Sequence, residues 1–436
     1  MSALPVPERV EGFGLYNVSV SPVFRPPSLE ALRDALAACA ALGATPVFRG
    51  AGRSYGDASL SPAGPVIETT GLNTIGGFDE ATGILRAGAG LTLGALWEFA
   101  IPRGFWPPVV TGTMHVTLGG AVAMNVHGKN GWKKGTLGDH VESVSVLKSD
   151  GRIEEIPRGT PAFDDVVGNW RRTDPIVEVA LRLKKVANGY LDVEAFVTQD
   201  LSATLAAIDA AKDDWDYVVG WMDCWAVGKS LGRSVVHVAN EHVWKEGEPR
   251  GWSVAEQIAD IHMGPLPTPI LLLGLRLTAS GPQMRLVNMA KYASAAVHGR
   301  HRYRQSLVAY SFLLDYLPGW NEAYRPGGFI QYQLFVPKEA AEAALGKALR
   351  LQHEMGVVSS LAVIKRHRAD PSPRGYVPDG FSLALDFAVT RRKASRLIAL
   401  CRAFDALLLE CGGSVYKAKD CVGSVERLAE ARGKRP

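Results

Sequence analysis

A glycine-rich segment at residues 49–57, RGAGRSYGD, has the residue types of an anion-binding turn. Glycine lets a backbone turn tightly and approach a ligand without a clash from Cβ. Successive N–H groups in such a turn form a concave site for anions. Arg53 and Ser54 add further donors, so a pyrophosphate would fit. Because short glycine motifs also occur in plain surface turns, this segment by itself leaves both interpretations open.

A second segment, at residues 111–130, combines small side chains with hydroxyl groups and carries almost no charge until its end. It contains a Gly-Gly pair followed by the polar residues Asn125, His127, Lys129 and Asn130. Such a run suits backbone that wraps a large planar cofactor. A glycine-rich loop with one hydrogen-bonded histidine is the alternative interpretation.

The pattern around these segments predicts an α+β chain with two domains, because 436 residues exceed one ordinary core. In the first half we predict helices at 28–42 and 91–104 and a β-hairpin at 140–157. Near residue 189 the pattern restarts with strands, including a tryptophan-rich core strand at 213–225. Strong helices are predicted at 202–214, 338–356 and 393–413. This mixture indicates an antiparallel sheet with helices packed on it.

The composition is that of an ordinary globular protein, with 47% hydrophobic and 21% charged residues. A formal net charge of +4 is small for a general polyanion binder, so we predict no nucleic-acid partner. The five cysteines form no C-x-x-C pair, which argues against a disulfide framework and a structural zinc site. The acidic residues show no metal-ligand spacing, so we infer no metal. The basic run at 298–304 favours a solvated face over a nucleic-acid or phospholipid contact.

The N-terminal residues lack the apolar stretch of a secretory signal. The strongest apolar run, at 269–275, is far shorter than the roughly 20 residues of a spanning helix. We therefore predict a cytoplasmic protein that does not cross a membrane. Peripheral contact with the inner membrane stays open.

Taken together, the two segments resemble the FAD-binding domain of the vanillyl-alcohol oxidase and p-cresol methylhydroxylase (PCMH) superfamily. The pattern R-G-x-G-R-S-Y-G-D, then G-T-x-x-x-T-x-G-G-A, then H-G-K-N is characteristic of that group. So are W-N-x-x-Y-x-x-x-G-F-x-Q-Y-Q at 320–333 and Y-x-x-K-D at 416–420. Within the superfamily these motifs are most similar to those of the decaprenylphosphoryl-β-D-ribose oxidases, which help make the arabinan precursor for cell wall biosynthesis. The resemblance spans residues 12 to about 420.

The resemblance implies a PCMH-type FAD-binding domain at 1–188, completed by 412–436, and an antiparallel-sheet substrate domain at 189–411. It implies that FAD contacts Phe48, Arg49, Gly50, Ala51, Gly52, Arg53, Ser54, Tyr55, Gly56, Asp57, Ala58, Gly112, Thr113, Thr117, Leu118, Gly119, Gly120, Met124, Asn125, Val126, His127 and Tyr416. Many relatives attach their flavin covalently through a histidine in the first motif. Arg53 stands at that position here, so the resemblance implies a non-covalent flavin.

The resemblance also implies an activity and its residues. Lys419 and His127 are expected beside the flavin as catalytic residues, although a solvated surface lysine is the alternative for Lys419. The expected substrate residues are Gln331, Gln333, Lys365, Lys129 and Asn130. The implied reaction oxidises a sugar secondary hydroxyl to a ketone, at C2 of a polyprenyl-phosphate-linked ribose, as the first half of an epimerisation. A separate NAD(P)H-dependent reductase subunit would complete it.

Two other functions stay open. One is an FAD-dependent oxidase of a free sugar, alditol or aldonolactone. The other is a flavin-free, non-catalytic homologue, which the first two of three departures from the family pattern motivate; the third changes only the shape of the pocket. Residues 167–175, VGNWRRTDP, replace a glycine-rich segment with bulky and charged residues that include Arg171, Arg172 and Asp174. The sequence after the Y-x-x-K-D motif is short, and Ala384 stands where characterised members carry a cysteine.

Overall fold

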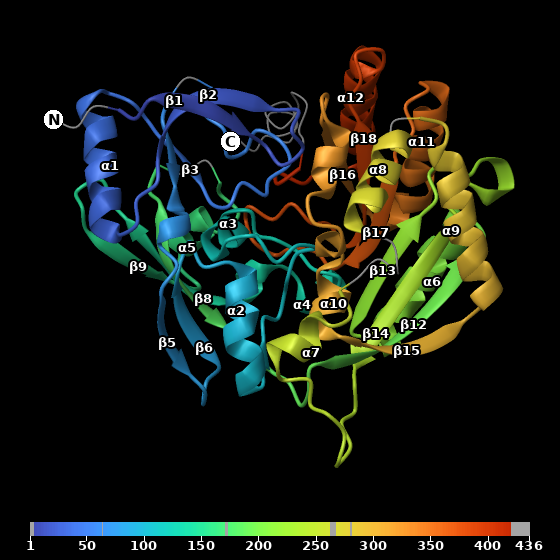
Figure 1. Cartoon of the computed structure of the whole chain (residues 1–436), viewed down its shortest axis with the longest axis horizontal. Helices are drawn as coiled ribbons and strands as arrows, with labels where there is room; N and C mark the ends of the chain where they lie inside the picture. Colours follow the sequence, from blue (N-terminus) through green and yellow to red (C-terminus); the bar gives the residue numbers. More distant parts are fainter. Residues whose placement is uncertain (1–3, 63, 171–172, 262–266, 280, 420–436) are drawn as a thin grey trace.

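The computed structural model describes residues 4–62, 64–170, 173–261, 267–279 and 281–419. Two domains lie side by side, with the N-terminal domain at the left in Figure 1. Both combine helices with sheets, and the larger sheets are antiparallel. The predicted α+β class is therefore confirmed.

The N-terminal domain contains two main sheets. The smaller has the strand order β1-β2-β4-β3, and the larger has the order β5-β6-β10-β8-β9. Their strands are β1 (Pro7–Glu11), β2 (Val18–Phe24), β3 (Val47–Arg49), β4 (Val66–Glu68), β5 (Ile75–Asp79), β6 (Ile84–Gly88), β8 (Val141–Leu147), β9 (Ile153–Pro157) and β10 (Ile176–Arg182). A short pair, β7 (Phe105–Trp106) with β11 (Lys184–Lys185), joins these sheets to the rest of the chain.

Helices fill the space around these sheets. They are α1 (Leu29–Ala41), α2 (Leu93–Ala100), α3 (Leu118–Ala123), α4 (Gly131–Lys134) and α5 (Pro161–Val166). Helix α1 begins as predicted, because Ser28 Oγ caps it by accepting from the Ala31 N–H at 3.2 Å. Helix α3 packs Leu118 and Val122 against the larger sheet, so part of the segment expected to wrap a cofactor forms a short helix.

The C-terminal domain is built on one eight-stranded antiparallel sheet, of order β15-β12-β14-β13-β17-β18-β16-β19. Its strands are β12 (Tyr190–Thr198), β13 (Tyr217–Met222), β14 (Ser234–Glu241), β15 (His301–Ser306), β16 (Phe329–Pro337), β17 (Leu361–His367), β18 (Gly380–Ala388) and β19 (Ser414–Val415). The last strand, β19, pairs with β16 although it lies far from it in sequence. The segment after residue 412 therefore begins inside the sheet of the C-terminal domain.

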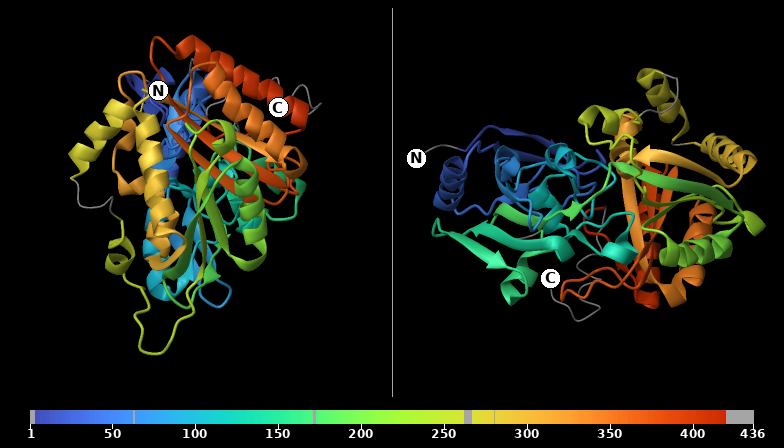
Figure 2. Two further views of the ribbon diagram at one scale, coloured as in Figure 1. Left: turned by 90° about the vertical axis from the view of Figure 1, so that its right-hand side faces the viewer. Right: turned by 90° about the horizontal axis from the view of Figure 1, so that it is seen from below.

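Different helices cover the two faces of this sheet (Figure 2). One face packs against α6 (Leu201–Asp214), α11 (Ala341–Glu354) and α12 (Ala394–Cys411), the three helices predicted from the sequence. The other face turns toward the N-terminal domain. On that side lie α7 (Val254–Ile258), α8 (Thr268–Thr278), α9 (Met284–His298) and α10 (Leu307–Ser311). Helices α8 and α9 were not predicted.

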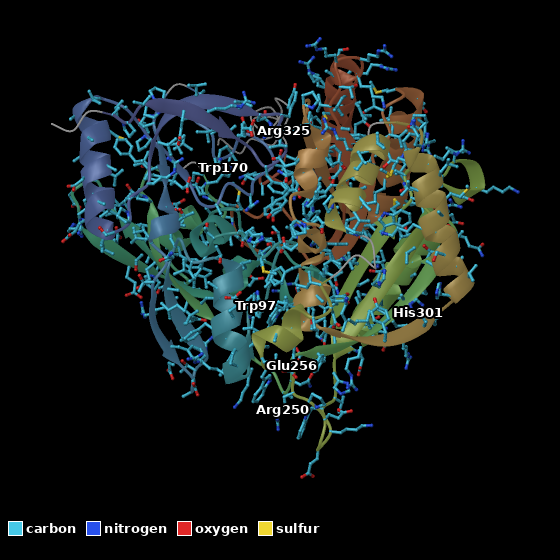
Figure 3. All side chains as sticks on the ribbon, viewed as in Figure 1. Trp97, Trp170, Arg250, Glu256, His301 and Arg325 are labelled. Atoms are coloured by element: carbon cyan, nitrogen blue, oxygen red, sulfur yellow. The ribbon has the colours of Figure 1, made fainter. Side chains whose placement is uncertain are left out.

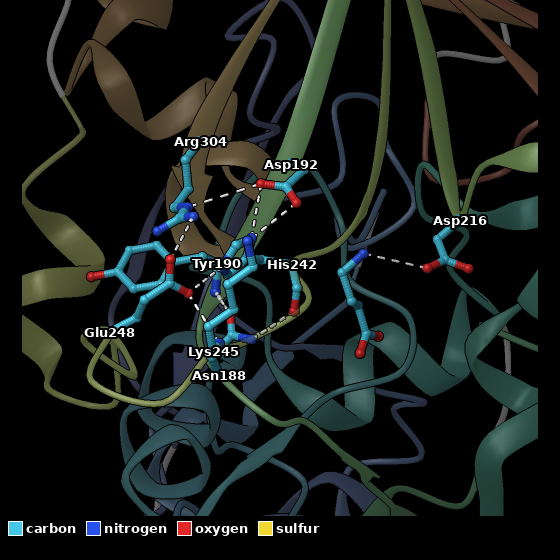
Figure 4. Close-up of polar contacts among 9 residues, drawn as sticks. Asn188, Tyr190, Asp192, Asp216, His242, Lys245, Glu248 and Arg304 are labelled. Carbon is cyan, nitrogen blue, oxygen red and sulfur yellow. Dashed lines mark hydrogen bonds and ion pairs between the residues drawn. The ribbon is translucent and has the colours of Figure 1, made fainter.

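A charged cluster ties the lower edge of the C-terminal domain together (Figure 4). His242 contacts the Asp192 carboxylate through Nδ1 at 2.9 Å and the Glu248 carboxylate through Nε2 at 2.8 Å. Arg304 lies between the same two carboxylates. These residues do not line either of the large cavities described below, so the cluster holds β12, β15 and the loop after β14 in place.

The basic run at 298–304 is largely neutralised by carboxylates on or near β12. Arg300 and Arg302 both pair with Glu194 of β12, and Arg304 pairs with the carboxylates just described. No helix within the described residues is both long enough and apolar enough to span a bilayer. The four described cysteines are free thiols.

Candidate functional site

A cavity of about 650 Å³ lies between the two domains. Its N-terminal wall comes from the glycine-rich segment and from the segment that ends in H-G-K-N. Its opposite wall is the face of the eight-stranded sheet that turns toward the N-terminal domain. This face contributes Trp221, Gln331, Gln333, Lys365 and Asp386. The C-terminal residues Tyr416, Ala418 and Lys419 complete it. Residues that are far apart in the sequence thus meet in one site.

The two N-terminal segments touch each other directly, and glycine is required at the contact. A Cβ at Gly50 would overlap Thr117 Oγ1. Gly52 has a φ of +65°, and a Cβ there would overlap the Arg49 guanidinium. A side chain at Gly50 would therefore displace the second segment, and one at Gly52 would displace the Arg49 side chain. This geometry supports the cradle interpretation over a plain surface turn.

Arg53 faces the space that this cradle encloses. Burial lowers the pKa of Arg53, and its Nε makes no hydrogen bond to any described residue. A buried guanidinium N–H without a partner is costly unless a ligand accepts from it. Phosphate oxygens are the acceptors that best match a guanidinium, so Arg53 fits the pyrophosphate of FAD.

A second cavity, of about 530 Å³, continues from the first. The two share Ala51, Gly52 and Arg53 as lining residues. The second cavity is bordered by β1 and by Arg325, which Figure 3 labels at the upper end of the junction between the domains. Arg325 pairs with Glu11 at 2.8 Å. Two cavities joined at the cradle offer the elongated space that a dinucleotide requires.

His127 lies at the centre of the polar part of the main cavity. Its Nε2 accepts a hydrogen bond from Gln333 Nε2 at 3.0 Å, and its Nδ1 faces the Gly128 carbonyl at 3.5 Å. Burial, reinforced by the positive charges of Lys365 and Lys419, holds the pKa of His127 well below its ordinary value. His127 is therefore a neutral imidazole at neutral pH.

Lys419 is positioned by the segment that follows β19. The Tyr55 N–H donates to the Ala418 carbonyl at 3.0 Å, which fastens this segment to the glycine-rich cradle. The Lys419 ammonium then lies 3.7 Å from the centroid of the Tyr55 ring, a cation–π contact. Lys419 is partly buried and lines the cavity, which supports the pocket interpretation over a solvated surface lysine.

Asp386 is a site residue that the sequence analysis missed. It is 1% exposed, and its Oδ1 accepts from Gln331 Nε2. Its Oδ2 makes no hydrogen bond to a described residue. Burial raises the pKa of Asp386 to about 7, while the Gln331 hydrogen bond and the Lys419 charge act in the opposite direction. A carboxyl group with such a pKa changes its protonation state near neutral pH.

The predicted substrate residues separate into two groups. Gln331, Gln333, Lys365 and Lys129 line the main cavity, and burial lowers the pKa of Lys365 to about 8. The Lys129 ammonium donates to the carbonyls of Tyr310 and Ser311, so it also fastens α10. Asn130 does not line this cavity, because its side chain turns away and donates to the Pro108 carbonyl at 2.9 Å.

Most of the predicted FAD contacts border the cavities. Those that do are Arg49, Gly50, Ala51, Gly52, Arg53, Ser54, Tyr55, Gly112, Thr113, Thr117, Gly120, Met124, Val126, His127 and Tyr416. Those that do not are Phe48, Gly56, Asp57, Ala58, Leu118, Gly119 and Asn125. Leu118 is buried in the core of the N-terminal domain, and Asn125 Oδ1 accepts from the Gly138 N–H at 2.8 Å.

Trp221 and Lys291 were also missed. Trp221 lies in the predicted core strand, but its ring borders the cavity, and the Lys291 ammonium of α9 lies 4.4 Å from the ring centroid. Alternation of apolar residues in β13 gives no sign of this, since a strand between a core and a cavity is apolar on both faces.

The departures from the family pattern lie mostly outside this site. Asp174 pairs with Lys148 at 2.6 Å, at the end of the β8–β9 hairpin, and no described residue of 167–175 lines either cavity. Arg171 and Arg172 lie outside the described residues, as do Asp420 and the rest of the predicted completion at 420–436. Ala384 does line the main cavity.

Comparison with known proteins decides the cofactor class. A family model described as an FAD-binding domain matches residues 20–157. The chain is 29% identical to the decaprenylphosphoryl-beta-D-ribose oxidase of Mycolicibacterium smegmatis over 434 residues, or 95% of this chain and 89% of that protein. This protein is an FAD-dependent oxidoreductase. The predicted resemblance to the PCMH-type flavoproteins is thereby confirmed.

Two further relatives match this oxidoreductase. It is 28% identical over 339 residues to an uncharacterised protein of Streptomyces coelicolor, a match that covers 76% of this chain and 89% of that protein. It is 43% identical over 88 residues to the UDP-N-acetylenolpyruvoylglucosamine reductase of Desulfosudis oleivorans, which covers 20% of this chain and 25% of that protein. That FAD is held without a covalent bond stays a prediction, which Arg53 motivates.

Proposed function

We propose that this oxidoreductase converts a secondary hydroxyl of a sugar into a ketone, at C2 of a polyprenyl-phosphate-linked ribose. The charge of the main cavity carries this proposal. Among the described residues, the cations that line it are Arg53, Lys291, Lys365 and Lys419, and Asp386 is the one carboxylate. Lys129 also lines it, but burial holds the pKa of Lys129 well below its ordinary value. Such a site favours an anionic ligand over a neutral sugar. The Mycolicibacterium smegmatis relative, a decaprenylphosphoryl-beta-D-ribose oxidase, supports the same substrate class.

When bound, FAD supplies the acceptor for the hydride that leaves the carbinol carbon. The chain must then take up the hydroxyl proton and hold the sugar in place. His127, as a neutral imidazole oriented by Gln333, is suited to hydrogen-bond a sugar hydroxyl. Asp386, beside Gln331 and within the field of Lys419, is suited to accept the proton. Lys419 supplies a positive charge at this end of the cavity.

The remaining wall of the cavity is apolar and aromatic. Trp221, Leu313, Leu314 and Tyr310 line it on the side of α9 and α10. This wall suits the first isoprene units of a polyprenyl chain, because it removes their surface from water. A neutral free sugar or aldonolactone, the main alternative substrates, would leave that apolar wall without a contact.

A polyprenyl chain keeps its carrier in a bilayer, so we propose that the enzyme works at the surface of the inner membrane. The ketone product requires a hydride to complete an epimerisation. We therefore also propose a partner reductase that uses NAD(P)H.

Anaerobic mixing tests the proposal. The purified protein is expected to be yellow, or to become so after incubation with FAD. Addition of a ribosyl polyprenyl phosphate should bleach the flavin absorbance, whereas free ribose, an alditol and an aldonolactone should not. Bleaching by a free sugar alone would contradict the substrate assignment. A colourless protein that FAD cannot reconstitute would favour the flavin-free homologue.

A further inference from the structure

Helices α8 and α9 form part of an acid-free stretch of the chain. From residue 261 to residue 314 the sequence contains no aspartate or glutamate. The same stretch contains the basic residues Arg276, Arg285, Lys291, Arg300, Arg302 and Arg304. The stretch is therefore strongly cationic in a chain whose overall charge is only +4. Helical surfaces of soluble proteins usually mix both signs of charge.

These two helices also expose large apolar side chains. Helix α8 has no buried residue, and Ile270, Leu273 and Leu277 are 54%, 57% and 66% exposed. Their spacing places them along one stripe of the helix. On α9, Leu286 and Val297 are 62% and 87% exposed. Single exposed leucines are ordinary, but a stripe of three on α8, followed by two more exposed apolar side chains on α9, the next helix in the chain, marks a binding surface.

The charges next to this stripe are available to a partner. Arg276 on α8 and Arg285 on α9 are exposed and make no ion pair with any described residue. In contrast, Arg300, Arg302 and Arg304 are occupied by carboxylates on or near β12. The surface of α8 and α9 thus presents apolar side chains together with unpaired arginines.

The same helices adjoin the main cavity. Lys291 of α9 lines the cavity, and the inner side of α8 packs with Leu314 and Tyr55, which line it as well. In Figure 2 both helices project from the face of the sheet opposite to α6 and α11.

We propose that α8 and α9 dock the enzyme on a bilayer containing anionic lipid. The apolar stripe would enter the boundary between headgroups and acyl chains, while Arg276 and Arg285 would contact lipid phosphates. The absence of acidic residues removes the repulsion that an anionic surface would otherwise meet. That docking gives the enzyme access to a lipid-linked substrate rests on the proposed function. The docking itself does not depend on that function.

Vesicle sedimentation of the FAD-loaded full-length chain tests this. Wild type should pellet with phosphatidylcholine vesicles that contain about 30 mol% phosphatidylglycerol, and less with phosphatidylcholine alone or in high salt. The variant I270Q/L273Q/L277Q and the variant R276E/R285E should each bind at least tenfold more weakly. A control variant, L42Q/V243Q, changes residues that are 55% and 75% exposed elsewhere, and should bind as wild type does.

Three results would overturn the docking proposal. One is absence of wild-type binding to the anionic vesicles. Another is equal binding by all the variants. The third is a wild-type dimer that the glutamine variant alone converts to a monomer without any vesicle binding, since the surface would then contact a second copy.

A water-soluble ribosyl phosphate with a short prenyl chain separates the two proposals. If wild type and the α8 variants oxidise this substrate at equal rates and wild type does not bind vesicles, the docking proposal alone is contradicted. Vesicle binding without any flavin bleaching would remove the proposed function only.

Discussion

The cavity face of the eight-stranded sheet and the outer surface of α8 and α9 depart from the usual distribution of residues in opposite directions. The sheet buries polar groups: Gln331, Gln333 and Asp386 are all less than 7% exposed. The helices expose apolar ones, and α8 buries none of its residues. Buried polar groups and exposed apolar groups both cost stability unless a partner compensates them.

The difference indicates two kinds of partner. The sheet presents fixed donors and acceptors at the end of short side chains on paired strands, as a small polar ligand requires. The helices present exposed apolar side chains together with unpaired arginines, as a fluid and extended partner requires. Substitutions on the cavity face of the sheet should therefore change the rate of the reaction. Substitutions on the outer surface of α8 and α9 should change binding of the enzyme to vesicles.

The largest effect is expected for Asp386→Asn. Loss of a proton acceptor should lower the rate of flavin reduction by on the order of 10²–10⁴-fold at pH 8. In wild type the rate should rise with pH up to about 7, because only the ionised carboxylate accepts a proton and burial raises the pKa of Asp386 to about 7. The variant should lack this inflection. Stopped-flow absorbance measures both.

Asp405→Asn is the matched control for that experiment. Asp405 is also a buried carboxyl, but it lies on α12, where it accepts from the Tyr332 hydroxyl on the other face of the sheet. Its rate and pH profile should stay those of wild type. An unchanged profile in Asp386→Asn would contradict the assignment of Asp386 as the proton acceptor.

A somewhat smaller loss is expected for Lys419→Ala. Removing the cation from the flavin end of the cavity should lower flavin reduction by on the order of 10²–10³-fold while FAD content stays normal. The ratio of flavin to protein absorbance measures the content. Lys347→Ala, in an exposed ion pair with Glu410, is the control and should change neither quantity. Normal turnover in Lys419→Ala would exclude that residue from the mechanism.

The free energy of unfolding should also differ between substitutions in the sheet and substitutions on the outer surface of α8. Leu334 of β16 is fully buried in the core below the sheet, so Leu334→Ala should cost about 2–5 kcal/mol in the free energy of unfolding. Leu277→Ala on α8 should change it by less than about 0.5 kcal/mol. Chemical denaturation of the holoprotein compares the two. A large cost for Leu277→Ala would mean that the outer surface of α8 is part of a core.

The smallest effect on catalysis is expected for Lys291→Gln. Lys291 lies on α9 and lines the main cavity, so it stands at the boundary between the two regions. Its ammonium contacts the Trp221 ring, and loss of a cation–π contact of this kind is worth roughly 0.5–1 kcal/mol. The KM for an anionic substrate should rise by about two- to fivefold with kcat unchanged, because a positive charge that lines the cavity is lost. A fall in kcat would instead mean that Lys291 acts on the reacting groups and not only on substrate binding.

Local signals in the sequence were sufficient for much of this fold. Ser28 predicted the start of α1, and the alternation at 140–157 predicted the β8–β9 hairpin, because a cap and a turn depend on neighbouring residues only. Gly50 and Gly52 by themselves left a cradle and a plain turn open, and the resemblance of the two segments to the family favoured the cradle.

The residues that were missed depend on contacts between distant segments. Asp386 becomes a site residue because β18 pairs with β16 and brings it beside Gln331. Asn130 was placed in the site because it belongs to the H-G-K-N motif of the family resemblance, yet its side chain and that of Lys129 point in different directions. The apolar run at 269–275 was recognised, but its exposure follows only from the position of α8 on the finished domain.

The hydrogen bond from the Tyr55 N–H to the Ala418 carbonyl has a consequence for biosynthesis. The cradle around Tyr55 is translated early, whereas β19 and Lys419 are translated after every other described element. A nascent chain therefore holds half of the flavin site until the ribosome has passed residue 419. Chains that terminate before Ser414 lack the strand that closes the sheet edge as well as the lysine. Tight flavin retention would then report that translation has proceeded through both domains.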